Sequence, residues 1–163
     1  MTRYDGAAKT GFDNKGISLS GVFGLPPRAH PDNVDRALQA ASDFAARLEN
    51  LGAEANIGVS FGRVCCGVFG NDSRREYSLF GDAVNLASRL STAAIEGVVI
   101  DEDTFHAASL TLEVEGRRVL AVKNRTEPVL AHRLLGLRPT EVAERELVGR
   151  EPERASSTGR SSS

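Results

Sequence analysis

The first clear pattern along the chain is an alternation of apolar and polar residues between Gly16 and Gly24. This period of two is typical of a half-buried β-strand. Pro26 and Pro27 follow the segment and would end the strand. We expect the strand to pair with residues around Lys9.

A helical pattern comes next. Its apolar residues recur three and four positions apart, and they are Val34, Leu38, Ala41, Ala45, Leu48 and Leu51. This spacing predicts an amphipathic helix. Gly52 is placed to end the helix, and Asp32 or Asn33 is suited to cap its start.

The rest of the chain predicts further strands and short helices. Residues 57–69 are rich in β-forming residues with Gly62 and Arg63 midway, and Gly70-Asn71-Asp72 follows as a turn, so we expect a hairpin here. The later elements are a helix over 82–94, a short buried strand over 98–100, a helix over 102–107, and weaker strands over 110–114, 118–122 and 129–135.

Composition narrows the class of protein. The chain has 163 residues, 40% of them hydrophobic, which is enough for one domain rather than two. A formal net charge of -2 gives no electrostatic bias toward nucleic acid or an anionic membrane. There is no apolar run that approaches the roughly 20 residues of a membrane span, and no apolar signal segment, which indicates a cytoplasmic protein. The phosphate-binding loop of ATPases is also absent.

The two cysteines, Cys65 and Cys66, are adjacent in an apolar stretch. A disulfide framework or a zinc site requires separated pairs. We therefore expect both side chains to be reduced and packed.

The densest chemical signal runs from Arg74 to Leu90, where a strand and a turn lead into a helix. Asn85 and Arg89 are four residues apart on that helix, so they share one face. An amide and a guanidinium that point together suit a phosphate ester being made or broken. From spacing alone, an ordinary surface arginine near an asparagine is the commoner arrangement.

Residues 57–90 closely resemble the catalytic domains of class III adenylate and guanylate cyclases, especially the soluble, bicarbonate-type branch and its bacterial relatives. The shared pattern is a glycine-rich hairpin, Arg-x-Glu-Tyr, and then Gly-Asp-x-Val-Asn-Leu-Ala-x-Arg. The resemblance extends over about residues 9–135. It implies an α/β (α+β) fold with a ferredoxin-like sheet packed by helices on one face.

The resemblance also implies roles for individual residues. Asn85 matches the residue that orients the ribose, and Arg89 matches the arginine that stabilises the pentavalent phosphorus as the 3′ oxygen attacks. Ser78 falls where the family reads adenine, and Lys9 lines up with the purine-reading lysine. Together these two favour ATP, because guanine carries a hydrogen on the ring nitrogen to which the lysine would donate.

For Ser78, Lys9 and a third residue, Lys123, an ordinary structural explanation is also open. Ser78 could be a strand-end serine satisfied by its own backbone, and Lys9 a solvated charge near the chain start, with Asn14 replacing an aspartate often seen in that motif. Lys123 resembles the lysine of the family's Val-Lys-Gly-x-x-x-Pro-Val element, which lies near the triphosphate. Asn124 replaces the glycine of that element, and an exposed hairpin lysine is the alternative.

The metal ligands of the family have no counterpart here. Class III cyclases bind two magnesium ions through two aspartates; the first would precede Met1, and Ile17 occupies the second position. A hydrocarbon side chain cannot ligate a hard cation. Asp13 is nearby but out of register, so we assign no metal ligand to this chain. We expect magnesium or manganese to be bound by a partner half instead.

The domain organisation follows from the same resemblance. We expect residues 1–137 to form a partial cyclase domain that begins after the family's first strand and helices. Residues 138–163 would form a linker and a Ser-rich, disordered tail. Within it, residues 146–154 resemble the start of AAA-type signalling ATPase domains.

The resulting hypothesis is the partner half of an adenylate cyclase, which acts in intracellular signalling. It would bind ATP and a second, metal-bearing cyclase domain, with no nucleic acid or membrane partner, and would make no cyclic AMP alone. Two alternatives stay open, so the sequence does not decide whether the chain is an enzyme. One is a catalytically inactive regulatory or nucleotide-binding module, and the other is the remnant of a broken gene.

Overall fold

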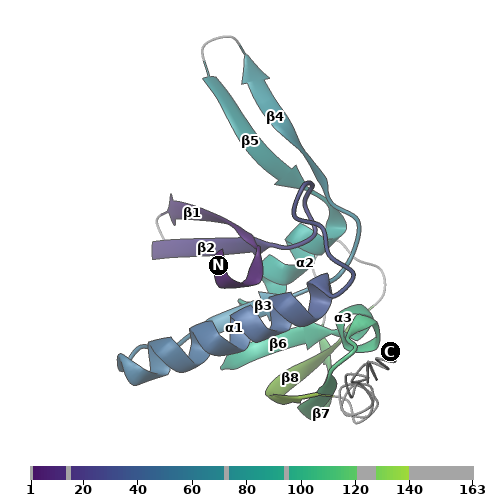
Figure 1. The fold of residues 1–163 in the computed structure, drawn as a ribbon. Helices are drawn as coiled ribbons and strands as arrows, with labels where there is room; N and C mark the ends of the chain where they lie inside the picture. Colours follow the sequence, from purple (N-terminus) through teal and green to yellow (C-terminus); the bar gives the residue numbers. More distant parts are fainter. Residues whose placement is uncertain (1, 14–15, 72–73, 94–95, 121–127, 140–163) are drawn as a thin grey trace, which may run out of the picture.

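A computed structural model describes residues 2–13, 16–71, 74–93, 96–120 and 128–139. Its centre is a four-stranded sheet in the order β3-β6-β8-β7 (Figure 1). The strands are β3 (Asn56–Val59), β6 (Gly97–Asp101), β7 (Thr111–Leu120) and β8 (Val129–Arg138). β3 pairs in parallel with β6, and the other pairings are antiparallel.

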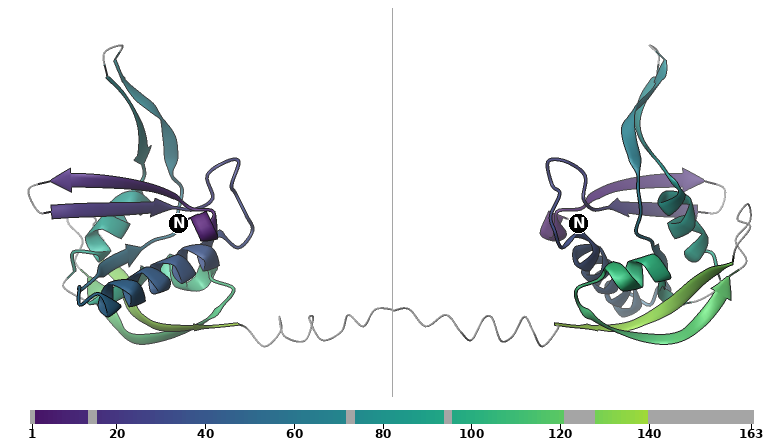
Figure 2. Two further views of the ribbon diagram at one scale, coloured as in Figure 1. Left: turned by 60° about the vertical axis from the view of Figure 1, so that its left-hand side comes forward. Right: turned by 90° about the vertical axis from the view of Figure 1, so that its right-hand side faces the viewer.

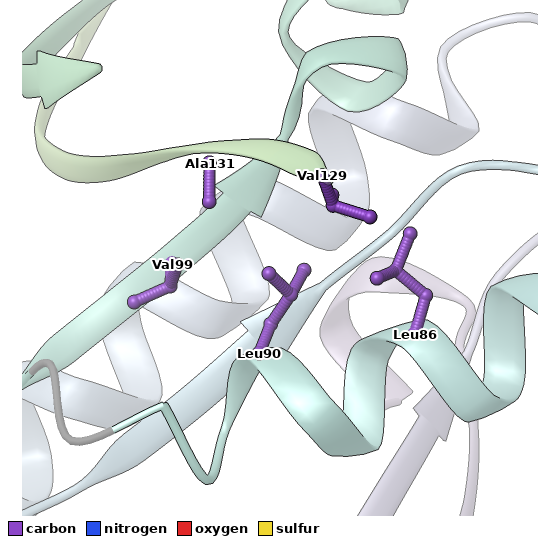
Figure 3. Close-up of a cluster of buried hydrophobic side chains, with 5 residues drawn as sticks. All are labelled: Leu86, Leu90, Val99, Val129 and Ala131. Atoms are coloured by element: carbon purple, nitrogen blue, oxygen red, sulfur yellow. The ribbon is translucent and has the colours of Figure 1, made fainter. Parts of the chain in front are cut away.

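Helices cover both faces of this sheet. Along β6, Val98 and Ile100 pack into a cluster that includes Leu38 of α1 (Asn33–Asn50). Val99, between them, packs on the opposite face in a cluster that includes Leu90 of α2 (Asp82–Leu90) (Figure 3). The α/β class is confirmed, but the expectation that helices pack on only one face of the sheet is wrong. Three consecutive apolar β-branched residues in β6 are buried on alternate sides, which requires cover on both.

The start of α1 differs from the expected capping. Asp32 occupies the N-cap position, but its side chain makes no capping hydrogen bond and instead accepts one from Arg36 Nε at 2.8 Å. Asn33 Oδ1 accepts from the backbone N–H of His30 at 3.1 Å, outside the helix. The predicted side-chain cap is therefore wrong at both residues. Their side chains fix the approach to the helix and pair along its first turn.

The end of α1 was predicted correctly. Gly52 has φ +71° and donates to Glu49 O at 2.9 Å, and Ala53 donates to Leu48 O at 2.9 Å. This pair of bonds is the Schellman arrangement, which needs a left-handed residue and so favours glycine. The helix ends where the glycine permits the chain to turn back toward β3.

Two hairpins lie outside the central sheet. β1 (Ala7–Asp13) pairs with β2 (Gly16–Val22), with Lys9 opposite Ser20, which confirms the first predicted strand and its partner. β4 (Cys65–Asn71) pairs with β5 (Arg74–Phe80). The β4–β5 hairpin extends away from the rest of the described chain (Figures 1 and 2).

The hairpin predicted within residues 57–69 is wrong. β3 belongs to the central sheet and β4 to the projecting hairpin, and residues 60–64 between them form no strand. The packed state of Cys65 and Cys66 is also wrong, because both are free and exposed. A strand that leaves the body of the protein cannot bury side chains on both of its faces.

The remaining elements follow the predictions with small shifts. α3 (Glu102–Ala107) has the predicted bounds, and α2 ends at Leu90 rather than at residue 94. The two weak strands expected over 110–114 and 118–122 form a single strand, β7. Gly116, at φ +60°, has no partner on β8, so the strand continues through a bulge.

Candidate active site

The predicted transition-state pair lies on α2. Asn85 is exposed and Arg89 is half-buried, and both belong to one continuous helix. Figure 3 shows Leu86 and Leu90 pointing from the same helix toward Val99 of β6 and the neighbouring strand β8. The buried leucines hold α2 on the sheet, and this leaves the amide of Asn85 open to a ligand.

Two glycines let α2 lie close to the rest of the chain. A Cβ at Gly58 of β3 would lie 2.0 Å from Ala87 O and 2.7 Å from Ser91 N. A Cβ at Gly81, directly before the helix, would lie 2.6 Å from Arg63 O. Real side chains do not reach such separations, so both positions require glycine. The backbone of α2 rests directly on β3 at the level of its last turn.

Ser78 lies on β5, the strand that leads through Gly81 into α2. Its side chain is half-buried, and its cross-strand neighbour on β4 is Gly67. A glycine places no side chain against the serine from the paired strand. The structure therefore connects Ser78 to Asn85 and Arg89 through one short turn.

Lys9 lies on a different element. It is an exposed residue of β1, and the ribbon views place the β1–β2 hairpin beside α2 (Figures 1 and 2). The structure thus brings Asn85 and Arg89 together on one helix, joins Ser78 to that helix, and puts Lys9 on a neighbouring hairpin. Lys123 is outside the described residues. The roles assigned to all five residues stay predictions.

Ile17, which the sequence aligns with the second metal-binding aspartate of class III cyclases, lies on β2. Ile17 is 76% exposed and offers no oxygen or nitrogen to a cation. In the part of the chain that the structure describes, no group of three or more His, Cys, Asp or Glu residues is arranged to hold a metal ion. The residues at this position do not fit the metal ions that class III cyclases use.

A cluster of titratable groups away from α2 was missed by the sequence reasoning. The carboxylate oxygens of Glu102, at the start of α3, lie 2.6 Å from His132 Nε2, 3.3 Å from His106 Nε2 and 3.5 Å from Arg117 Nη2. The hydrogen bond with His132, aided by the charge of Arg117, holds the pKa of Glu102 below its ordinary value. Only the four-residue spacing of Glu102 and His106 was visible in the sequence.

Comparison with known proteins decides the family. The profile of the adenylate and guanylate cyclase catalytic domain matches residues 22–134. The chain belongs to this family. None of the helices that the structure describes is long and apolar enough to cross a membrane.

Sequence relatives of this cyclase-family chain come from animals and bacteria. Adenylate cyclase type 10 of Homo sapiens is 35% identical over 100 residues, which cover 60% of this chain and 6% of the relative. An uncharacterised protein of Mycobacterium tuberculosis is 39% identical over 101 residues, covering 59% of this chain and 19% of the relative. The chain therefore spans a small part of the length of these relatives.

Solved structures show the same fold. The guanylyl cyclase Cya2 has a TM-score of 0.65 and 26% identity, with 83% of this chain and 73% of that chain covered. The guanylate cyclase domain of RhGC from Catenaria anguillulae, solved in complex with GTP, has a TM-score of 0.67 and 24% identity, with 84% and 76% covered. The ferredoxin-like cyclase fold is thus confirmed.

Proposed function

We propose that this chain is the partner half of an adenylate cyclase and works in the cytoplasm in cyclic AMP signalling. It supplies purine-reading and transition-state groups, and a second cyclase domain supplies magnesium or manganese. The observation that carries the proposal is the combination of Asn85 and Arg89 on α2 with Ile17 on β2. Side chains that match the family's transition-state groups are present, and the residue aligned with a metal ligand has a hydrocarbon side chain.

The chemistry explains why these groups suffice for a half-site. The ribose 3′ oxygen forms a bond to the α-phosphorus of ATP, the bond from that phosphorus to the bridging oxygen breaks, and diphosphate leaves while the hydroxyl proton is released. Such a reaction depends on in-line geometry and on neutralising negative charge. Asn85 orients the ribose, and Arg89 stabilises the charge that develops on the phosphoryl oxygens.

Base recognition is the second part of the proposal. Lys9 donates to the adenine ring nitrogen and Ser78 accepts from the exocyclic amino group, while Lys123 contacts the triphosphate. A hydroxyl can play the acceptor role because it has two lone pairs. The relatives named adenylate cyclase type 10 support ATP as the substrate.

The surface of the chain supports a second cyclase domain as the partner. Large apolar side chains are exposed on both hairpins: Ile17 on β2, and Val68 and Tyr77 on β4 and β5. Val68 and Tyr77 are cross-strand neighbours, so they form one apolar face. Contiguous exposed apolar surface marks an interaction site. A domain docked against these hairpins would also lie close to α2.

The test is complementation. We expect no cyclic AMP from the purified chain with ATP and magnesium or manganese, and turnover when a metal-bearing cyclase domain is added. In that mixture, Arg89→Ala should lower kcat about 10²–10³-fold, the loss typical of one oxyanion-stabilising donor. Arg118→Ala removes an exposed arginine of β7 and serves as the matched control. Turnover by the unmixed chain, or wild-type kcat in the Arg89→Ala mixture, would refute the proposal.

The apolar residue at position 17 also favours a second candidate, a regulatory module that binds a nucleotide without turnover. The two candidates differ in one measurement. ATP binding by calorimetry that is lost in Lys9→Ala, together with no cyclic AMP in any mixture, would favour the regulatory module.

A further inference from the structure

Residues 60–64, which connect β3 to β4, pass over the first turn of α2. Ser60 Oγ donates to the backbone oxygen of Ala83 at 2.7 Å, in a partly buried position. A Cβ at Gly62 would lie 3.1 Å from Ala83 Cβ, and Gly81 lies under Arg63 O. The connection therefore approaches Ala83 in the first turn of α2 at two points, one of them a side-chain hydrogen bond, and it also approaches Gly81, the N-cap residue before the helix.

The hydrogen bond of Ser60 does something that the apolar contacts of α2 cannot do. Leu86 and Leu90 are buried against the sheet, and burial of apolar surface has no preferred direction. These two leucines hold the middle and the last turn of α2 on the sheet, and Ser60 acts on the first turn. A hydrogen bond has a preferred length and angle. Ser60 therefore fixes the position of the first turn of α2 relative to the end of β3.

This first turn leads directly to the proposed catalytic side chains. Ala83 is two residues before Asn85, and the backbone N–H of Asn85 donates to Gly81 O at 3.3 Å. A shift of Ala83 would thus move Asn85 with it, and Arg89 one turn later on the same rigid helix. A misplacement of about 1 Å can cost about 10²-fold in rate when reacting groups must be aligned.

We infer that Ser60 is a positioning residue for the cyclase reaction, one that sets the register of α2 and so the alignment of Asn85 and Arg89. The inference rests on the proposed function of those two residues. Ser60 itself contacts no substrate in this role. Loss of its hydroxyl should therefore lower kcat without changing the preference for ATP over GTP, which Lys9 and Ser78 would set from other elements.

The experiment compares three variants in the complemented mixture. Ser60→Ala removes the hydroxyl, and Ser60→Thr retains it. Ser91→Ala removes the hydroxyl of the C-cap residue of α2, which donates to Ser88 O at 2.8 Å, a local bond that does not reach β3. We expect kcat to fall about three- to tenfold in Ser60→Ala, as the loss of one hydrogen bond implies. Ser60→Thr and Ser91→Ala should stay within twofold of the wild type.

A second measurement does not depend on turnover. Hydrogen exchange of the Asn85 amide, which donates to Gly81 O and closes the first turn of α2, should be faster in Ser60→Ala than in the wild type, Ser60→Thr or Ser91→Ala. Exchange that is unchanged in Ser60→Ala would overturn the inference, and so would a normal kcat in a mixture where Arg89→Ala is impaired. If Arg89→Ala also turns over normally, the proposed function of α2 fails first, and faster exchange alone would still support a fixed position of the helix.

Discussion

At the scale of single residues, Glu102 shows how a carboxylate can join three elements. It belongs to α3, and its contacts are His106 on the same helix, His132 on β8 and Arg117 on β7. The ring of Phe105 stacks on His132 with a centroid separation of 5.0 Å. These contacts tie α3 to the two strands at the edge of the sheet.

The lowered pKa of Glu102 leads to a pH-dependence of stability. Because the pKa is lower in the folded chain than in the unfolded one, the ionised carboxylate stabilises the fold above its ordinary pKa, and this contribution disappears as the pH falls through the lowered value. We expect the wild type to exceed Glu102→Gln in unfolding free energy near neutral pH and to lose that advantage in acid. Urea unfolding between about pH 7 and pH 3 measures it.

The control for this prediction is Glu54→Gln, at an exposed glutamate between α1 and β3. It loses the same charge without the contacts of the cluster. If the advantage of the wild type over Glu102→Gln were constant across the acid range, the cluster would not depend on ionised Glu102.

The sequence was most informative about residues that lie together in one motif. Asn85 and Arg89 are on a single helix, so their shared face follows from the helical period alone. Ser60 and Ala83 are 23 residues apart, and Glu102 and His132 are 30 apart. Such pairs depend on the order of the strands in the sheet and on where the helices pack, and a local sequence pattern does not contain this information.

At the scale of elements, the position of α2 depends on Gly58. Gly58 lies in β3 opposite Val99 of β6, on the face that α2 covers. A glycine inside a strand often marks the close approach of another backbone. That signal was present in the sequence, but it does not say which helix approaches.

Replacing Gly58 with alanine should displace α2. The added carbon would meet Ala87 O and Ser91 N, both of them backbone atoms that cannot rotate away. We expect Gly58→Ala to lower the free energy of unfolding by at least about 2 kcal/mol, in the upper range of overpacking. It should also reduce kcat in the complemented mixture. Urea unfolding at equilibrium measures the first effect.

Gly52→Ala separates crowding from backbone strain. Gly52 has φ +71° and no atom within contact of an added carbon, so its substitution should cost only about 1 kcal/mol, from the left-handed conformation. Equal losses at the two glycines would indicate that crowding at α2 is relieved by a small adjustment.

Other elements show where periodicity fails as a guide. Leu112 and Val114 pack on the α1 face of the sheet, whereas Leu120 of the same strand packs on the α2 face. The bulge at Gly116 shifts the alternation, so the sequence pattern predicts two short strands where the structure has one. Similarly, the sequence predicts one hairpin over β3 and β4, because both segments are β-rich and only the pairing of β3 with β6 separates them.

At the scale of the whole molecule, the described chain consists of a body and two hairpins. The body is the central sheet with its helices on both faces, and the β4–β5 hairpin projects from it (Figure 2). Ile17, Leu19, Val68 and Tyr77 are exposed on the hairpins although each belongs to a strand. The sequence correctly predicted strands here, but it could not show that these strands lie outside the main sheet.

This exposed apolar surface predicts that the chain associates, either with itself or with a second cyclase domain. Val68 is 64% exposed, and Lys at this position would place a charge in the contact. We expect sedimentation velocity over a range of concentrations to show association of the wild type, and Val68→Lys to weaken both this association and activation in the complemented mixture.

Val119→Lys is the matched control, because Val119 of β7 is 63% exposed but lies on the body of the protein rather than on a hairpin. The same decrease in both variants would indicate nonspecific association of apolar surface, and a wild type that sediments as a monomer at every concentration would contradict self-association. A loss of association and activation that is confined to Val68→Lys would place the contact on the β4–β5 hairpin, whose second strand contains Ser78 and leads into α2.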